Sequence, residues 1–495
     1  DHAEGFGSIK ACTDALTPDI QDSCELINSP NVLSFLKLRA NVEKRPMVQD
    51  LSYFDNDKTI ERRYHLDTWQ AIKTAAERHN EPGVFTAFAG YEYSSALADR
   101  GKHHRNVIFR GSATPDYAVS AYDADSEIDL WKQLDANCSG ACEFLTIPHN
   151  PNKSWGLAFA SETIDGIPYT RDDWRLREKF EPLVEMFQIK GNSECVIGLG
   201  TTDEECGFEQ FFPVCEEGQE TLCIQPTSMV RDGLKKGLVL EEALGFNPMK
   251  FGLMASTDTH NSNPGDTEEW DYRGANAFMG SPARVRLEKG RRNPRVTNPG
   301  GLAAVWAPEN TRDALFDAMS RREVYATSGT RMTLRFFGGA DLPTDLTESG
   351  DLETAYAKGV PMGGTLEADA GVPKLFVWAT QDPDNAPLAK IQIIKGWLED
   401  GETKEKVFDI ACAQTDTSDA CVSTSAPVDL RDCSWSDAPG APELRSVWED
   451  PDYDPAHNAF YYARVVQIPT CRWTTYSPAQ EAPPEDSILW LLFPD

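Results

Sequence analysis

The sequence predicts an α/β protein with a second, β-rich part at its C-terminal end. Between about residues 60 and 335, short apolar segments alternate with segments of helical periodicity. Such alternation is typical of a parallel sheet covered by helices on both faces, either a barrel or a doubly wound sheet. After about residue 336 the helical periodicity weakens and β segments with hairpin-like turns such as "DGE" follow. We therefore expect two domains, residues 1–335 and 336–495.

The first predicted helix lies in "HLDTWQAIKTAAERHN". Asp67 is a candidate N-cap, because its carboxylate can accept a hydrogen bond from a free N–H of the first turn. Trp69, Ile72 and Ala76 recur at helical spacing and form the expected apolar face. The Pro-Gly pair after this segment is expected to end the helix.

The remaining elements of residues 1–335 follow in order along the chain. The expected helices are "SEIDLWKQLDAN", capped by Ser126, and "ENTRDALFDAMSRR". A Cys-rich, irregular stretch at about residues 195–225 is predicted to be an inserted loop. The expected strands are "VFTAFAGYEY", "HHRNVIF", "EFLTIPHN", "EPLVEMFQIKG", "MKFGLMAST" and "EVYATSG".

The β segments of residues 336–495 are apolar and rich in β-branched and aromatic side chains. They include "KLFVWATQD", "AKIQIIKGWLEDGETKEKVFDIA" and "AFYYARVVQI". We predict a smaller β-rich domain from them.

The charge balance excludes one class of partner. The chain has 47 basic and 79 acidic residues, which gives a net charge of −32. Nucleic-acid binding depends on Lys and Arg contacts to phosphates, so a nucleic-acid partner is not expected. No apolar run of about eighteen residues is present, so no membrane span is predicted.

Twelve cysteines indicate an oxidising compartment. Most of them have a close neighbour in sequence, and nearest-neighbour pairing is the simplest disulfide pattern; reduced, buried cysteines are the alternative. We predict a periplasmic or secreted protein. The first residues, "DHAEGFG", do not have the features of a signal peptide.

Side chains that bind metals fall where predicted strands begin or end. The C-terminal ends of parallel strands form the active-site face of α/β folds. Imidazoles and carboxylates at that face suit a divalent metal such as zinc, manganese or iron. The residues concerned are Asp1, His2, Glu92, His103, His104, His149, Asp258 and His260.

Each of these residues also has a structural interpretation. A single D-x-H pattern, such as Asp258 and His260, is common by chance. Glu92 alone is compatible with a surface carboxylate, and His149 with a turn. His103 and His104 cannot both point into one site, because neighbours on a strand face opposite sides.

Several segments resemble a known family. They are "DHAEGFG", "GYEYSS", "HHRNVIFRG", "IPHNPNKS", "EMFQIKGNSE", "STDTHN" and "REVYATSGTRM", together with "VWATQDPD", "IQIIKGW" and "DPDYDPAHNAFYYARVVQIPTCRWTTY". They look like a bacterial domain-of-unknown-function family that adjoins the polymerase and histidinol phosphatase (PHP) superfamily. The resemblance covers nearly the whole chain. It implies a distorted (β/α)7 PHP-like barrel with two or three divalent metals at its C-terminal face.

The resemblance also implies roles for individual residues. Glu92 would bridge two metals, and His104 and His149 would complete one of them. His2, in the family's "TDH" motif, and His260 would serve another position, and Asp258 would bind the metal that histidines of the family's first strand also hold. Asp1 would be the neighbouring acid, so the implied catalytic set is Asp1, Glu92 and His260.

The sequence departs from the family at its beginning. The family has an upstream strand that ends in an H-x-H-T motif, and this segment is absent before Asp1. A truncated or processed protein would explain this, and a separate N-terminal fragment carrying that strand would then be a partner.

The function implied is metal-dependent hydrolysis of a phosphate ester. A hydroxide shared by two metals would attack in line while the metals neutralise the developing charge. Arg105, Asn150, Asn152 and Lys153 follow the ligand positions and are candidates for binding a small anionic substrate; loop hydrogen bonding is their alternative role. A sulfate ester suits the same metals. A non-catalytic binding protein with structural metals is the alternative from another class.

Overall fold

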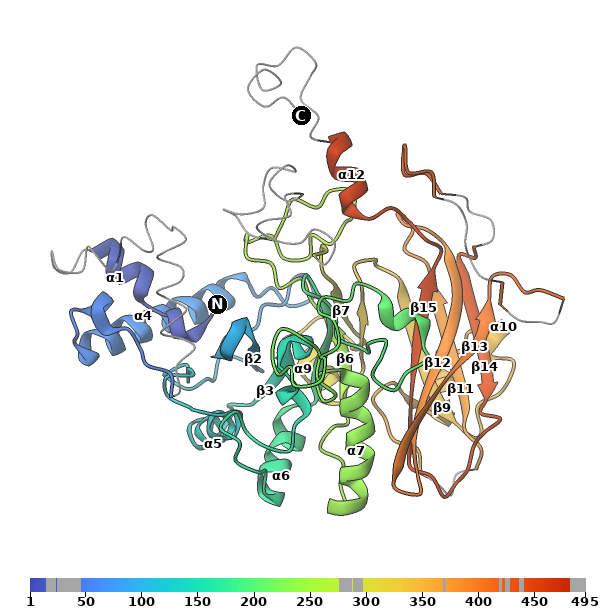
Figure 1. Ribbon diagram of the computed structural model, residues 1–495, viewed down its shortest axis with the longest axis horizontal. Helices are drawn as coiled ribbons and strands as arrows, with labels where there is room; N and C mark the ends of the chain where they lie inside the picture. The colour runs from blue at the N-terminus through green and yellow to red at the C-terminus, as the bar shows by residue number, and fades with distance from the viewer. Residues whose placement is uncertain are drawn as a thin grey trace, which may run out of the picture. The chain divides into compact units, whose positions relative to one another are not determined.

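The computed structural model describes residues 1–14, 24, 46–275, 287, 297–367, 371–417, 421–422, 428–435 and 440–480 (Figure 1). The chain divides into two compact units that alternate along the sequence. The first unit comprises Asp1–Glu185, Phe212–Gly252 and Val305–Glu323. The second comprises Met186–Phe211, Leu253–Ala304 and Val324–Asp495. The predicted domain boundary at residues 335 and 336 stays a prediction.

Helices and strands are distributed over both units. The α-helices are α1 (Ser8–Asp14), α4 (Lys58–His79), α5 (Glu127–Asn137), α6 (Arg171–Phe180), α7 (Val230–Leu244), α9 (Arg312–Ser320), α10 (Leu346–Ser349), α11 (Leu352–Lys358) and α12 (Trp473–Gln480). The strands are β1 (Gly90–Ala96), β2 (Lys102–Phe109), β3 (Phe144–His149), β4 (Leu183–Gln188), β5 (Gly191–Asn192), β6 (Gly252–Ala255), β7 (Leu302–Val305), β8 (Val324–Thr327), β9 (Thr333–Gly339), β10 (Val360–Pro361), β11 (Lys374–Thr380), β12 (Leu388–Glu399), β13 (Glu402–Cys412), β14 (Glu443–Glu449) and β15 (Ala459–Gln467).

The first unit contains a sheet of order β1-β2-β3, and both of its pairings are antiparallel. The prediction of a parallel arrangement is wrong for these strands. Only Leu97 to Gly101 separate β1 from β2, and a parallel connection needs a crossover of a dozen or more residues. The antiparallel order has a useful consequence: the start of β2 lies at the same edge as the ends of β1 and β3.

One face of this sheet packs against the core of the first unit. Tyr91 and Phe109 on the strands contact Trp69 of α4, with ring centroids 5.5 and 5.9 Å apart from it. Trp131 of α5 donates from its indole N–H to Thr146 of β3 over 3.0 Å. The predicted apolar face of the first helix is therefore confirmed at Trp69, which is fully buried.

The predicted N-cap of that helix is wrong. Helix α4 begins at Lys58, and its N-cap is Asp57, whose carboxylate accepts the N–H of Thr59 over 2.7 Å. Asp67 lies inside the helix and is exposed. The upstream residues "KTIERRY" extend the helical periodicity, and Asp57, which directly precedes them, is the cap. The predicted Ser126 cap of α5 is confirmed, because its hydroxyl accepts the N–H of Asp129 over 3.2 Å.

Strand β1 begins later than the apolar run predicted. Val84 and Phe85 are 67% and 61% exposed and belong to a turn in which Phe85 pairs with Glu81. The strand extends instead through the polar residues Ser94 and Ser95. The ends of the strand therefore follow its pairing with β2 rather than hydropathy.

Smaller sheets complete the α/β part. One has the order β5-β4-β6, and β7 pairs with β8. Among the residues that the structure describes, helices are mixed with several small sheets and no sheet closes into a barrel. The (β/α)7 barrel stays a prediction.

Two antiparallel sheets in the second unit face each other (Figure 1). Their strand orders are β10-β9-β11-β14 and β13-β12-β15. Buried residues of β11, such as Val377, pack against buried residues of β12, such as Ile391. The predicted "DGE" hairpin is confirmed: Asp400 and Gly401 both have positive φ and connect β12 to β13, as type I′ turns require.

Six disulfides follow the nearest-neighbour pattern. They are Cys12–Cys24, Cys138–Cys142, Cys195–Cys206, Cys215–Cys223, Cys412–Cys421 and Cys433–Cys471. No helix in the described part of the chain is both long enough and apolar enough to cross a membrane.

Candidate metal centre

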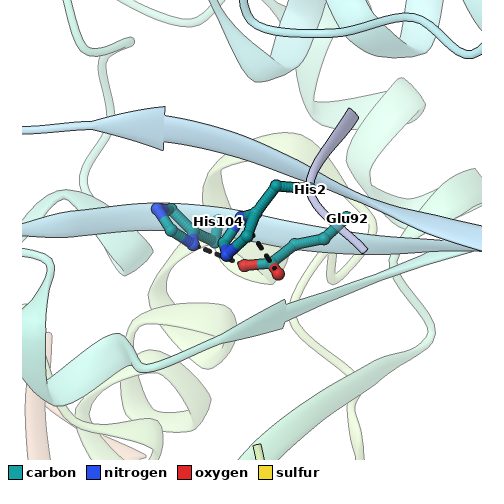
Figure 2. A group of neighbouring side chains, drawn as sticks. All are labelled: His2, Glu92 and His104. Atoms are coloured by element: carbon teal, nitrogen blue, oxygen red, sulfur yellow. Dashed lines mark hydrogen bonds and ion pairs between the residues drawn. The ribbon is translucent and has the colours of Figure 1, made fainter. Parts of the chain in front are cut away.

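Three imidazoles surround the carboxylate of Glu92 in the first unit. The Nδ1 atom of His104 lies 2.6 Å from Oε1 of Glu92, and Nε2 of His149 lies 3.0 Å from the same oxygen. The Nδ1 atom of His2 lies 3.2 Å from the other oxygen, Oε2. Figure 2 shows His2, Glu92 and His104 pointing toward one another. The two oxygens therefore face different histidines.

The strand register explains this convergence. His104 of β2 is paired with Ser94 of β1 on one side and with His149 of β3 on the other. Paired residues project to the same face of a sheet, and Glu92 shares that face because it lies two residues before Ser94. Glu92, Ser94, His104 and His149 thus form one surface, which we call the ligand face.

The N-terminal segment brings the third imidazole. His2 forms a parallel bridge with Glu92, and the N–H of Glu92 donates to the carbonyl of Asp1 over 2.9 Å. The imidazole of His2 also contacts the hydroxyl of Ser94 and is 44% exposed. Asp1, predicted to be catalytic, contributes this backbone carbonyl to the centre.

Burial and hydrogen bonding set the protonation states. Burial alone would raise the pKa of Glu92, but the nearby charge of His2 and hydrogen bonds from His104 and His149 outweigh it. The pKa of Glu92 is therefore held well below its ordinary value. Burial, aided by the positive charge of Lys102, lowers the pKa of His104 well below its ordinary value. An ionised carboxylate thus faces a neutral imidazole.

This set of donors fits a divalent transition metal. Ligand atoms of His2, Glu92 and His104 all lie within 4.8 Å of one another. Neutral imidazole and carboxylate are the ligands that zinc, manganese and iron accept. The Nδ1 atom of His149 is buried without a hydrogen-bond partner among the described residues. A ligating histidine usually donates from its second nitrogen, so this part of the outer shell is incomplete.

The opposite face of the same sheet, which we call the core face, holds His103 and Arg105. The Nε2 atom of His103 lies 3.0 Å from Oε2 of Glu127, and both side chains are buried. The guanidinium of Arg105 donates from Nε to Glu181 over 2.9 Å and is also fully buried. The structure thus distinguishes the two neighbouring histidines: His104 belongs to the ligand face and His103 does not. Arg105, predicted to bind substrate, lies on the core face in an ion pair.

The other predicted anion-binding residues lie in the turn that follows His149. Asn150 has a left-handed backbone, with φ of 56°, and its N–H donates to Oε1 of Glu185 over 3.2 Å. Asn152 and Lys153 belong to a short 3-10 helix, Pro151–Lys153, and are buried. The ammonium of Lys153 lies 5.6 Å from the ring centroid of Phe212. The turn therefore places amide groups and an ammonium group within four residues of His149.

Asp258 and His260 belong to the second unit. The carboxylate of Asp258 forms an ion pair with Lys190, which follows β4. The Nδ1 atom of His260 lies 2.8 Å from the backbone carbonyl of Asp258. A carbonyl can only accept, so Nδ1 of His260 carries a proton. The predicted metal-binding roles of Asp258 and His260 stay predictions.

The sequence interpretation missed two residues that contact predicted ligands, and a third that contacts Ser94. Ser94 contacts His2, and its place two residues after Glu92 on a strand could have indicated it. Lys190 pairs with Asp258, and no sequence pattern links these two residues. The carboxylate of Glu4 accepts the backbone N–H of Ser94, and a glutamate two residues after His2 gave no signal of this.

A second group of ligand-type side chains has a different explanation. Cys195, Asp203 and Cys206 lie close together in the second unit. The two cysteines form a disulfide, and Asp203 is held by two hydrogen bonds from Arg464, 2.9 and 2.8 Å long. The disulfide and the hydrogen bonds from Arg464 engage the side chains that could hold a metal, so this group has a structural role.

Comparisons with known proteins identify the family. The chain belongs to the family described as a protein of unknown function, DUF3604, which matches residues 1–487. An uncharacterized protein of Chlamydia pneumoniae is 22% identical over 285 residues, which cover 58% of this chain and 34% of that relative. The chain thus matches about a third of the relative's length. No solved structure shows significant similarity to the chain.

Proposed function

We propose that the protein is a metal-dependent hydrolase of phosphate esters, with Glu92 at the centre of its active site. The observation that carries the proposal is the division of the Glu92 carboxylate between its partners. One oxygen faces His104 and His149, and the other faces His2. A carboxylate with nitrogen ligands on each oxygen is suited to bridging two cations. This arrangement supports the roles that the resemblance to PHP-like enzymes implies.

The centre has more nitrogen donors than a structural carboxylate needs. The charge of one ionised carboxylate is balanced by a single cation, yet three imidazoles converge on Glu92. Divalent metals, when bound, lower the pKa of bound water and neutralise charge that develops on the ester oxygens. The chain's own part is to keep His104 neutral through burial and to hold the imidazoles at fixed positions.

The turn after β3 supplies groups for an anionic substrate. Asn150 starts the turn, and Lys153 ends the 3-10 helix that follows it. An ammonium group can pair with a phosphate oxygen, and an amide can donate to one. We propose that Asn150, Asn152 and Lys153 bind the ester's anionic group. Arg105 is left out because it is paired with Glu181 on the core face.

The proposed location is extracytoplasmic. Six disulfides join all twelve cysteines, and disulfides persist in oxidising compartments. We propose a periplasmic or secreted protein that acts on small esters there.

One experiment tests the function. The purified protein is stripped with a chelator, reloaded with zinc, manganese or iron(II), and analysed for bound metal and for turnover of an aryl phosphate, an aryl phosphodiester and an aryl sulfate. We expect at least one equivalent of metal and metal-dependent release of phosphate. Preferred turnover of the sulfate ester would replace a phosphatase with a sulfatase on the same residues. Bound metal without turnover of any ester would favour a binding protein with structural metals and would reject the proposal.

A further inference from the structure

We propose that Glu4 is a positioning residue that sets the place of His2 against Glu92. Its carboxylate oxygen Oε1 accepts the backbone N–H of Ser94 over 3.1 Å and the backbone N–H of Ala121 over 2.7 Å. These amides belong to β1 and to the loop before α5. The inference deepens the proposed function, because His2 is one of the ligands on which that function rests.

The first argument is the interrupted ladder between the N-terminal segment and β1. The segment runs parallel to β1 at His2, where the N–H of Glu92 donates to the carbonyl of Asp1. In a parallel pair the next N–H on that edge belongs to Ser94, two residues later. A main-chain carbonyl would accept it if the segment continued as a strand. The carboxylate of Glu4 accepts it instead, so the side chain continues the ladder where the main chain leaves it.

The second argument is the turn that takes the main chain away. Ala3–Gly5 form a 3-10 turn, in which the N–H of Gly5 donates to the carbonyl of His2 over 3.1 Å. The carbonyl of His2 is therefore engaged inside the turn. The two hydrogen bonds to Glu4 join the turn to β1 and to Ala121. They therefore fix the position of the N-terminal segment along β1 and its orientation about its own axis.

The apolar anchors of the segment do not do this by themselves. Ala3 and Phe6 are buried in the core, and Phe6 stacks near Trp69 with ring centroids 6.5 Å apart. Apolar contacts are not directional, so they hold the segment in place but leave its register with β1 weakly determined. Hydrogen bonds from fixed backbone amides supply the missing direction.

Glu4 is a positioning residue and not a further ligand. The ligand atoms that cluster within 4.8 Å of one another come from His2, Glu92 and His104, and Glu4 is not among them. Its Oε1 atom is already used by two backbone amides. Its Oε2 atom is buried without a hydrogen-bond partner among the described residues. Glu4 thus acts on the centre through the main chain of residues 1–5.

The test measures the exposure of His2 in metal-free protein, so it does not depend on catalysis. Diethylpyrocarbonate labels accessible imidazoles, and peptide mass spectrometry gives the rate at His2 relative to the exposed His79 of α4. In Glu4→Ala we expect labelling of His2 to rise about three- to tenfold, because two hydrogen bonds that hold the N-terminal segment to β1 and Ala121 are lost. Hydrogen exchange should also quicken in the peptides that contain Ser94 and Ala121.

The matched control is Glu4→Gln. Its amide oxygen can accept the same two N–H groups, so labelling of His2 should stay within about twofold of the wild-type rate. Glu4→Asp keeps the carboxyl group but shortens the side chain, and we expect an intermediate rate. Should Glu4→Ala fail to fold, the Asp and Gln variants carry the comparison alone. Equal labelling rates in Glu4→Ala and wild type would overturn the inference. If Glu4→Ala does not fold, equal labelling rates in Glu4→Asp and Glu4→Gln would overturn it.

A metal titration separates this inference from the proposed function. If Glu4→Ala weakens one metal equivalent about tenfold while a second equivalent is unchanged, the weakened one is the position served by His2. If Glu4→Ala weakens both metal equivalents equally, or weakens neither of them, the result would count against a specific effect on His2. A protein that hydrolyses no ester but shows the expected labelling would reject the proposed function and keep the role of Glu4.

Discussion

The two faces of the β1–β2–β3 sheet use the same residue types for opposite purposes. On the core face, His103 meets Glu127, and Arg105 meets Glu181. On the ligand face, one carboxylate meets three imidazoles. His103 and His104 are neighbours in sequence and both are 4% exposed, so neither composition nor burial distinguishes them.

The difference lies in how completely each carboxylate is paired. Glu127 receives His103 on one oxygen and the hydroxyl of Tyr169 on the other, and Arg105 adds a nearby positive charge. Charges buried in such pairs are satisfied within the protein. On the ligand face three imidazoles share one carboxylate, and the centre opens to solvent at His2. Three imidazoles on one carboxylate at a partly open edge favour the proposed metal site, whereas balanced pairs favour a structural role.

The largest expected effect comes from Glu92→Gln. The variant should lose bound metal and metal-dependent hydrolysis, because a neutral amide is a much poorer metal ligand than a carboxylate. The variant should stay folded with a lower thermal midpoint, because the depressed pKa of Glu92 means that the folded state favours the ionised carboxylate. Metal analysis measures the metal content, phosphate ester hydrolysis assays measure the activity, and thermal unfolding measures the stability of the variant.

Glu127→Gln is the control from the core face. It should keep its metal and lose about 1–3 kcal/mol of stability, since the partners of the carboxylate are left poorly satisfied. If Glu92→Gln retains full metal content, or if Glu127→Gln loses it, the functional distinction between the faces is wrong.

The second effect is on stability alone. Arg105→Met removes one partner of a buried ion pair and should destabilise the protein by about 3–5 kcal/mol. Arg110 just follows β2 and forms more exposed pairs with Asp317 and Glu143. Arg110→Met should therefore cost less than about 1 kcal/mol. Denaturant unfolding compares the two, and similar losses would contradict the buried role of Arg105.

The third effect contrasts the two neighbouring histidines. Loss of an outer-shell partner weakens metal binding by about 10–100-fold. His104→Ala removes a proposed ligand, so it should weaken metal binding by more than this. His103→Ala should leave metal affinity within about tenfold and lower stability by about 1–3 kcal/mol, because Glu127 loses a hydrogen bond. Calorimetric metal titration and thermal unfolding of both variants measure these effects. A reversed pattern would assign His103 to the centre.

The sequence predicted the residues of the ligand face better than their geometry. Alternation along β1 and β2 showed that only one of His103 and His104 could face the site. The choice between them required the register of β2, which depends on pairing with residues far apart in sequence. The short link between β1 and β2 is a local signal of an antiparallel pair, because a parallel connection needs a dozen or more residues.

Other features were beyond local patterns for physical reasons. Glu4 acts on backbone amides at Ser94 and Ala121, which are brought near it only by the fold. The pairing of Lys190 with Asp258 also joins distant segments. In contrast, the Ser126 cap and the disulfide pairs were predictable, because their partners lie close in sequence.

The smallest expected effect is the pH dependence contributed by Glu127. Burial would raise its pKa, but the charge and hydrogen bond of His103, with Arg105 and Tyr169, outweigh burial and hold the pKa well below the ordinary 4.5. A depressed pKa in the folded state means that the unfolded state binds more protons at acid pH. The stability that Glu127 contributes is therefore present above about pH 4.5 and is lost as the pH falls toward the folded-state pKa. The free energies of unfolding of wild type and Glu127→Gln should differ most at pH 6–7, and this difference should narrow by about 1 kcal/mol or more at pH 3. Thr146→Val serves as the comparison, because the Thr146 hydroxyl bonds to the indole of Trp131 and the carbonyl of Phe180 and to no titrating group, so its difference from wild type should stay constant over the same range. A gap for Glu127→Gln that is equally constant would show that the core face is not held together by an ionised carboxylate.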